Sequence, residues 1–190
     1  CTTNKPILLR QGKGFNPGNK IFVSGKISEK DESLLPTINK LKVEIVALSF
    51  TQTPKDVLNL KKIINPKIKI CSKIENQAGL NNLSKIIKVS DLVVVARGDL
   101  TSAFQEKKVP LIQEKIVALC KRLKKPVIVA SYILSSMKFN FYPTNQEVDD
   151  IKKIATQGAD MIWMDSPTAV GLYPVETIEM AKKAIKNAKN

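Results

Sequence analysis

Two polar segments follow apolar runs in the middle of the chain, and their residue types could carry out metal-assisted chemistry. Lys73 and Glu75 close the run that begins at Ile68, and Arg97-Gly98-Asp99 closes the run that begins at Asp91. Parallel β/α proteins keep their reactive groups at the carboxyl ends of the strands. The lysine and the two acids are therefore expected at one edge of a sheet, in a metal-assisted site.

Each segment also has an ordinary structural interpretation. A Lys-x-Glu sequence at a strand end commonly forms a surface ion pair worth roughly 0–1 kcal/mol. An Arg-Gly-Asp tripeptide commonly forms a loop. Taken singly, each segment favours the structural interpretation. Their position after successive apolar strands favours a site instead, and Lys73 and Glu75, which are two residues apart, face the same side of a regular strand.

The composition is that of a globular protein with a basic surface. The chain has 190 residues, 43% of them hydrophobic and 25% charged, with a net charge of +14. Such a charge favours anionic ligands, including phosphorylated substrates. The lysines are spread along the chain without an RNA-binding motif or aromatic-basic interleaving, so we do not expect nucleic-acid binding; a basic RNA-associated module is the third hypothesis.

Cysteine and histidine counts exclude several kinds of site. Three cysteines lie far apart and form no CxxC pair, which argues against zinc and disulfide frameworks. The chain has 0 His, which excludes Ser-His triads and imidazole catalysis. No apolar run approaches the roughly 20 residues that span a bilayer, and no signal peptide is visible. Because residue 1 is Cys rather than Met, we expect either a processed chain or a piece of a longer one.

The hydrophobic pattern alternates between strands and helices. Five near-continuous apolar runs predict strands that are buried on both faces, at Val43–Phe50, Ile68–Ile74, Asp91–Ala96, Pro126–Ala130 and Ala159–Met164. Helical patterns lie between them, at Pro54–Ile64, Leu80–Lys88, Val109–Lys124 and Asn145–Gln157. A further helix is expected to begin at Ser28, or nearer Glu32 because Pro36 lies within it.

This order predicts an α/β fold built of about five β/α units. A closed (β/α)8 barrel and an open doubly wound sheet both use such units, and the missing GxGxxG fingerprint weakens the second. Five strands cannot close an eight-stranded barrel, so a TIM-type barrel would be partial, with about three units missing before residue 26.

With these motifs in hand, the chain resembles pyruvate kinase over almost its whole length. Ser72-Lys73-Ile74-Glu75-Asn76 and Val95-Ala96-Arg97-Gly98-Asp99-Leu100 are similar to the family's SKIEN and VARGDL. Further, shorter matches lie in family order along the chain, at Ser28-Glu29-Lys30-Asp31, Ser49-Phe50, Pro143-Thr144 with Glu147, and Tyr173-Pro174. The resemblance implies the later part of the catalytic barrel, over residues 26–190. Residues 1–25 would be a linker and remnant of the family's inserted lid domain.

The resemblance implies phosphate transfer from phosphoenolpyruvate to ADP, giving pyruvate and ATP in glycolysis. Lys73 would stabilise the transferring phosphoryl group and the enolate, and Glu75 and Asp99 would bind the essential Mg²⁺. The Ala96-Arg97-Gly98 backbone would border the substrate carboxylate, with Lys73 and Asp99 also lining the site. Ser131 stands where the family has a threonine near the substrate and would be catalytic and substrate-binding; its other interpretation is ordinary strand-end polarity.

The family also implies K⁺, whose ligands lie on early strands that have no counterpart here. We expect a cytoplasmic location, with a plastid as the alternative, and either a homo-oligomer or a partner that supplies the missing strands. Four positions depart from the family pattern, at Gln52, Thr101, Asn145 and Pro167. They motivate a second hypothesis, a non-catalytic fragment or partner-binding subunit.

Overall fold

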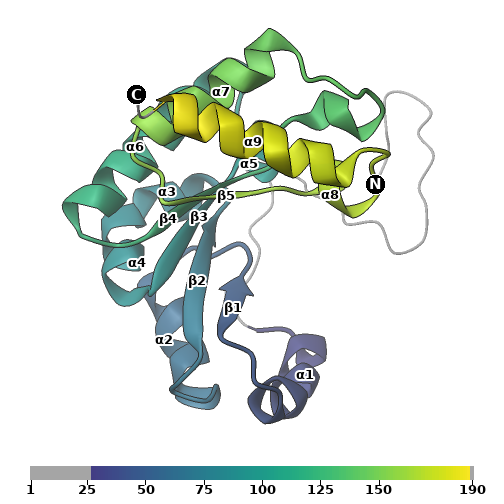
Figure 1. Cartoon of the computed structure of the whole chain (residues 1–190). Coiled ribbons are helices and arrows are strands. Elements are labelled where there is room, and N and C mark those ends of the chain that lie inside the picture. The colour runs from purple at the N-terminus through teal and green to yellow at the C-terminus, as the bar shows by residue number, and fades with distance from the viewer. Residues whose placement is uncertain (1–26, 189–190) are drawn as a thin grey trace, which may run out of the picture.

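The computed structural model describes residues 27–188 and shows one curved parallel sheet with helices along its outer side (Figure 1). Its strands are β1 (Ile45–Leu48), β2 (Lys69–Ile74), β3 (Leu92–Ala96), β4 (Val127–Ala130) and β5 (Met161–Trp163). The longer helices are α1 (Glu29–Lys40), α2 (Pro54–Ile63), α6 (Val109–Arg122), α7 (Asn145–Thr156) and α9 (Pro174–Ala188). The shorter ones are α3 (Gln77–Asn81), α4 (Leu83–Val89), α5 (Arg97–Ala103), η2 (Glu106–Lys108), η3 (Ser135–Lys138) and α8 (Ser166–Ala169).

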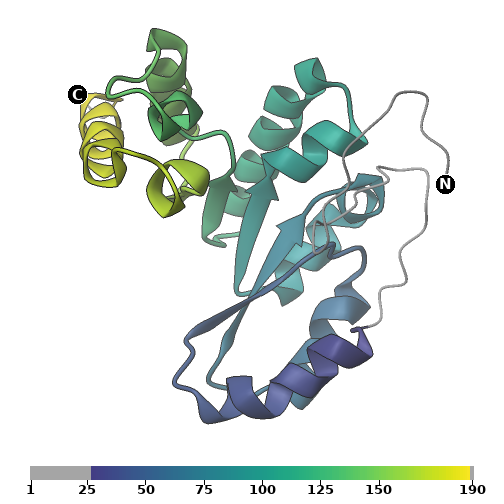
Figure 2. The same cartoon turned by 90° about the vertical axis from the view of Figure 1, so that its right-hand side faces the viewer.

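The sheet has the strand order β1-β2-β3-β4-β5, and every neighbouring pair is parallel. A doubly wound sheet reverses its strand order at a switch point, whereas a barrel adds each strand beside the preceding one. The sequential order therefore confirms the predicted α/β, barrel-type fold, and Figure 2 shows the curvature of the sheet from the side. The expected lid remnant at residues 1–25 lies outside the described residues.

Local signals fix several helix starts. Thr53 and Asp56 form a capping box at α2, whose first residue is Pro54. At α1 the Ser28 side chain accepts a hydrogen bond from the Asp31 N–H. The alternative start near Glu32 is wrong: this cap holds the start at Glu29, and the helix continues past Pro36 at a cost of about 3 kcal/mol.

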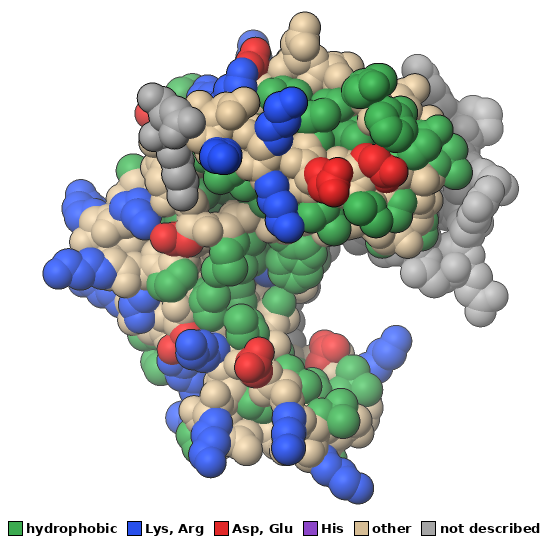
Figure 3. All heavy atoms as spheres, in the orientation of Figure 1, with side chains coloured by type: hydrophobic (Ala, Val, Ile, Leu, Met, Phe, Trp, Pro, Cys, Tyr) green, Lys and Arg blue, Asp and Glu red, His purple; other side chains and the backbone are tan. Residues whose placement is uncertain are grey.

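Burial follows each strand's position in the sheet. The central strand β3 is buried along its whole length, as predicted. The prediction of two buried faces is wrong for β1 and β5, since Ile45 is 44% exposed and Trp163 is 45% exposed. Both strands are ends of the open sheet, so their inward-facing side chains lack a covering neighbour. Figure 3 shows hydrophobic side chains at the surface beside the hollow of the molecule.

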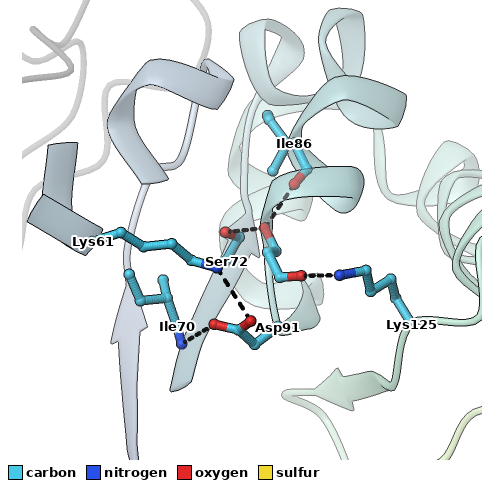
Figure 4. A network of polar contacts seen from close by, with 7 residues as sticks. Lys61, Ile70, Ser72, Ile86, Asp91 and Lys125 are labelled. Carbon is cyan, nitrogen blue, oxygen red and sulfur yellow. Dashed lines mark hydrogen bonds and ion pairs between the residues drawn. The ribbon is translucent and has the colours of Figure 1, made fainter. Parts of the chain in front are cut away.

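Buried hydroxyl groups tie the central strands of the sheet together (Figure 4). Ser72 Oγ and Ser90 Oγ, both 0% exposed, lie 2.6 Å apart, and Ser90 donates to the Ile86 carbonyl at 2.7 Å. The Ser90 carbonyl accepts a 2.7 Å hydrogen bond from Lys125 Nζ, just before β4. These contacts hold β2, α4 and the segments before β3 and β4 in one register.

One aspartate directly precedes β3 and another precedes β5. Each accepts a hydrogen bond from a backbone N–H and forms an ion pair with a lysine. Asp91 accepts from the Ile70 N–H at 2.8 Å and lies 3.2 Å from Lys61 Nζ (Figure 4). Asp160 accepts from the Val127 N–H at 2.9 Å and lies 2.9 Å from Lys121 Nζ. Each aspartate thus links the start of one strand to the preceding strand and its helix, so the role of Asp160 is structural.

None of the described helices combines the length and apolarity needed to cross a bilayer.

Candidate active site

Lys73 and Glu75 meet at the carboxyl end of β2. Lys73 Nζ lies 2.7 Å from Glu75 Oε1, and the side chains are 22% and 1% exposed. Lys73 Nζ also lies 3.4 Å from Ser49 Oγ, which follows β1. Glu75 is therefore a buried carboxylate whose cationic partner still reaches solvent.

The two oxygens of Glu75 have different surroundings. Oε2 accepts a hydrogen bond from the Phe50 backbone N–H, and the side chain also interacts with Asp99 at the start of α5. Oε1 accepts no well-aligned hydrogen bond from a described residue, although Lys73 Nζ is close enough for an ion pair. The Lys73 ammonium is therefore the cationic partner of this oxygen, and the Asp99 carboxyl lies beside the same side chain.

Burial raises the pKa of Glu75 above its ordinary value, and the neighbouring Asp99 carboxyl raises it further. Lys73 and the Phe50 N–H oppose this shift by stabilising the ionised form. The balance shows that burial outweighs the favourable contacts. A divalent cation at this position would favour the ionised carboxylate.

The donor set fits Mg²⁺ better than metals that prefer nitrogen or sulfur ligands. Mg²⁺ is commonly bound by one or two carboxylates and keeps positions for water and substrate oxygens. Glu75 and Asp99 supply two carboxylates in contact. Within residues 27–188 no three His, Cys, Asp or Glu side chains gather as a metal site, which is compatible with a two-carboxylate arrangement.

The segment after β3 is helical, whereas an Arg-Gly-Asp tripeptide commonly forms a loop. α5 begins directly at Arg97, with Ala96 as a cap residue that makes no side-chain hydrogen bond. At Gly98 a Cβ atom would lie 3.3 Å from Ser131 Oγ, so glycine permits a close approach of α5 to the end of β4. The structure thus places Gly98 and Ser131 side by side, next to Asp99.

The Arg97 side chain makes protein contacts that the sequence did not reveal. Its Nε donates to the Ser131 carbonyl at 3.0 Å, and its Nη1 lies 2.7 Å from Asp150 Oδ2 on α7. The side chain is only 8% exposed. Asp150 was missed because it lies 53 residues from Arg97 and no local pattern connects the two. Phe50 was missed because its contribution is a backbone N–H that donates to Glu75 Oε2. Every residue except proline has such a group, so the residue type does not reveal its role.

Comparison with known proteins identifies the family. Residues 1–178 match the family model described as "Pyruvate kinase, barrel domain". The chain belongs to the pyruvate kinase family. It is 38% identical to a pyruvate kinase of Clostridium acetobutylicum, covering 100% of this chain and 41% of that protein. It is 36% identical to a pyruvate kinase of Staphylococcus aureus, covering 95% of this chain and 31% of that protein.

A solved structure agrees with these relatives. A crystal structure of a pyruvate kinase from Cryptosporidium parvum superposes with a TM-score of 0.83 at 30% identity, over 86% of this chain and 35% of that one. The chain thus spans between about a third and two fifths of the length of these pyruvate kinases. Family membership accounts for the sequential parallel sheet and for the order of the motifs along the chain.

Proposed function

We propose that this chain forms the later part of a pyruvate kinase barrel and supplies part of its active site. This site transfers phosphate from phosphoenolpyruvate to ADP. The observation that carries the proposal is the cluster of Lys73, Glu75 and Asp99 where β2 and β3 end, within a pyruvate kinase barrel domain. Phosphoryl transfer depends mostly on positioning and on neutralising negative charge. A lysine beside two metal-binding carboxylates meets both requirements.

Each residue has a separate task in this proposal. Glu75 and Asp99 would hold Mg²⁺, which supplies charge neutralisation at the phosphate and substrate oxygens when it is bound. Lys73, which keeps 22% exposure, would donate to oxygens that become more negative during transfer. The backbone at Ala96-Arg97-Gly98 would border the substrate carboxylate, and the Ser131 hydroxyl beside Gly98 would contact the substrate's methylene end.

The structure also limits what the Arg97 side chain can do. Its guanidinium is committed to the Ser131 carbonyl and to Asp150, and it is nearly buried. We therefore propose that only the backbone of Arg97 borders the substrate. We also propose, from membership of the family, that the complete protein binds K⁺ and is cytoplasmic. We propose further that strands from elsewhere complete the barrel.

The test is Mg²⁺-dependent formation of pyruvate from phosphoenolpyruvate and ADP, with Lys73→Met as the inactive variant. Lys30→Met, which changes an exposed lysine of α1, is the matched control. Full turnover requires the missing barrel strands, from a parent chain or a partner, and with these present we expect pyruvate formation by the wild type and by the control, and a loss of at least about 100-fold in the Lys73 variant. Equal rates in all three would refute the assigned role of Lys73.

A second candidate is a non-catalytic member that associates with other strands. The exposed inward-facing side chains of the end strands favour it, with Met161 at 43% and Trp163 at 45% exposure. So does Gln52, a departure from the family pattern that is only 4% exposed and so lies within the fold. This candidate predicts no binding of Mg²⁺ with phosphoenolpyruvate in calorimetry, whereas saturable binding would exclude it.

A further inference from the structure

The segment that follows β4 has an unusual backbone and carries one of the candidate site residues. Ser131, Tyr132 and Leu134 have φ values of 71°, 58° and 49°, which are three of the five positive values among the described non-glycine residues. Such conformations are sparsely populated and persist only where surrounding contacts enforce them. We call residues 131–134 the Ser131 loop.

The two ends of the Ser131 loop are held in different ways. Ile133 and Leu134 are 1% and 0% exposed, so apolar packing in the core fixes the later end. At the earlier end, the Ser131 carbonyl accepts hydrogen bonds from Arg97 Nε at 3.0 Å and from Arg97 Nη2. A guanidinium presents its donors in a rigid planar fork, so one arginine defines both the position and the direction of this carbonyl.

Arg97 is in turn oriented by a carboxylate on α7. Its Nη1 lies 2.7 Å from Asp150 Oδ2, and no other salt bridge to Arg97 is formed within residues 27–188. Three residues earlier, on the same face of α7, Glu147 accepts hydrogen bonds from the Ser136 N–H at 2.8 Å and from its hydroxyl. The helix therefore holds the chain after β4 through two acids spaced by one turn.

We propose that Asp150 is a positioning residue: by orienting Arg97 it holds the Ser131 loop so that the Ser131 hydroxyl lies against Gly98. The geometry supports this step, because a Cβ at Gly98 would lie 3.3 Å from Ser131 Oγ. The consequence for phosphoenolpyruvate rests on the proposed function, whereas the effect on the loop does not. Asp150 would then influence the site although it lies on an outer helix.

The surroundings of Asp150 make the proposal testable in a folded protein. Its side chain is 33% exposed, and a cavity of about 310 Å³ lies beside it, lined also by Tyr132, Gln113 and Lys153. Removal of the carboxylate therefore leaves space that water can enter, and not a sealed void in the core. Asp149, the preceding residue on α7, is 69% exposed and bonds only to Lys152 within the described contacts, which makes it a matched control.

The experiment compares Asp150→Ala, Asp150→Asn and the control Asp149→Ala in the 190-residue chain. The first readout is the NMR signal of the Arg97 Nε–H group with the amide signals of Gly98 and Tyr132. We expect exchange of the Nε–H with water to be faster by at least about 10-fold in Asp150→Ala, and both amide signals to shift. Asp150→Asn keeps an acceptor for Nη1, so its exchange rate and amide signals should lie between those of the wild type and of Asp150→Ala. Asp149→Ala should match the wild type in both.

The second readout is the affinity for phosphoenolpyruvate in the presence of Mg²⁺. We expect a loss of about 10-fold in Asp150→Ala, partial recovery in Asp150→Asn and no change in Asp149→Ala. Unchanged Arg97, Gly98 and Tyr132 signals in Asp150→Ala would overturn the proposal. Shifted signals with unchanged affinity would support the effect of Asp150 on the loop and refute its consequence for phosphoenolpyruvate. A wild type that does not bind phosphoenolpyruvate would refute the proposed function, while the NMR signals would still decide the role of Asp150.

Discussion

The Lys73–Glu75 ion pair allows a quantitative prediction about stability. Lys73→Met leaves Glu75, which is 1% exposed, without the cation at 2.7 Å. Removal of one partner from a buried ion pair commonly costs about 3–5 kcal/mol. Because the Lys73 side chain is 22% exposed, part of this interaction is already screened by solvent, and we expect a loss of about 2–3 kcal/mol near neutral pH.

The loss should depend on pH in a defined direction. Burial raises the pKa of Glu75 in the folded chain, so the folded state binds this proton more tightly than the unfolded state. Such a group makes folding more favourable as the pH falls through its folded pKa. Lys73 opposes the shift, so the variant should have a still higher pKa at Glu75. Once Glu75 is protonated in both proteins, their stabilities should differ by less than about 1 kcal/mol.

The assay is urea unfolding followed by far-UV circular dichroism at mildly acidic and neutral pH. Glu75→Gln and the double variant complete a double-mutant cycle, which isolates the interaction between the two side chains. We expect the double variant to be about as stable as Glu75→Gln alone. A loss in Lys73→Met that is the same at both pH values, or losses that simply add in the double variant, would refute the reasoning.

Three further predictions concern single residues. Burial opposes ionisation of Glu147, but the hydrogen bonds it accepts outweigh this and lower its pKa, so Glu147→Gln should cost about 1–2 kcal/mol near neutral pH in urea unfolding. That cost should vanish as the pH falls through the lowered pKa, since an acid of this kind stabilises only while ionised. Gly171→Ala should cost more than about 2 kcal/mol in thermal unfolding, because its Cβ would lie 2.2 Å from the Pro167 carbonyl oxygen. Gly98→Ala should leave stability within about 1 kcal/mol but weaken phosphoenolpyruvate binding in calorimetry, because its Cβ would lie 3.3 Å from Ser131 Oγ and displace that hydroxyl.

The sheet was predictable because its signals are local. Each strand lies within a predicted apolar run, and the predicted start of α2 at Pro54 coincides with the observed one. The meeting of Lys73 with Glu75 followed from their two-residue spacing along one strand, and that of Glu75 with Asp99 from the rule that parallel strands end at one edge. Their proposed roles came from the resemblance to pyruvate kinase.

Other features depend on contacts between distant segments. The Asp150–Arg97 pair joins residues that are 53 positions apart, and no residue pattern specifies it. Exposure of Trp163 depends on whether a strand lies beyond β5, which its own apolar neighbours do not indicate. α9 carried a recognisable start signal, with Pro174 at its first residue, but it lies beyond the fifth strand pattern and was not predicted.

The account depends most directly on Glu75 and Asp99 sharing one divalent cation. Mn²⁺, a paramagnetic substitute for Mg²⁺, can be titrated into the 190-residue chain while the amide NMR signals are recorded. We predict selective broadening at Phe50, Asn76 and Leu100, lost in Glu75→Gln and in Asp99→Asn but kept in the exposed control Glu114→Gln. Broadening centred elsewhere, or unaffected by the first two substitutions, would contradict the account.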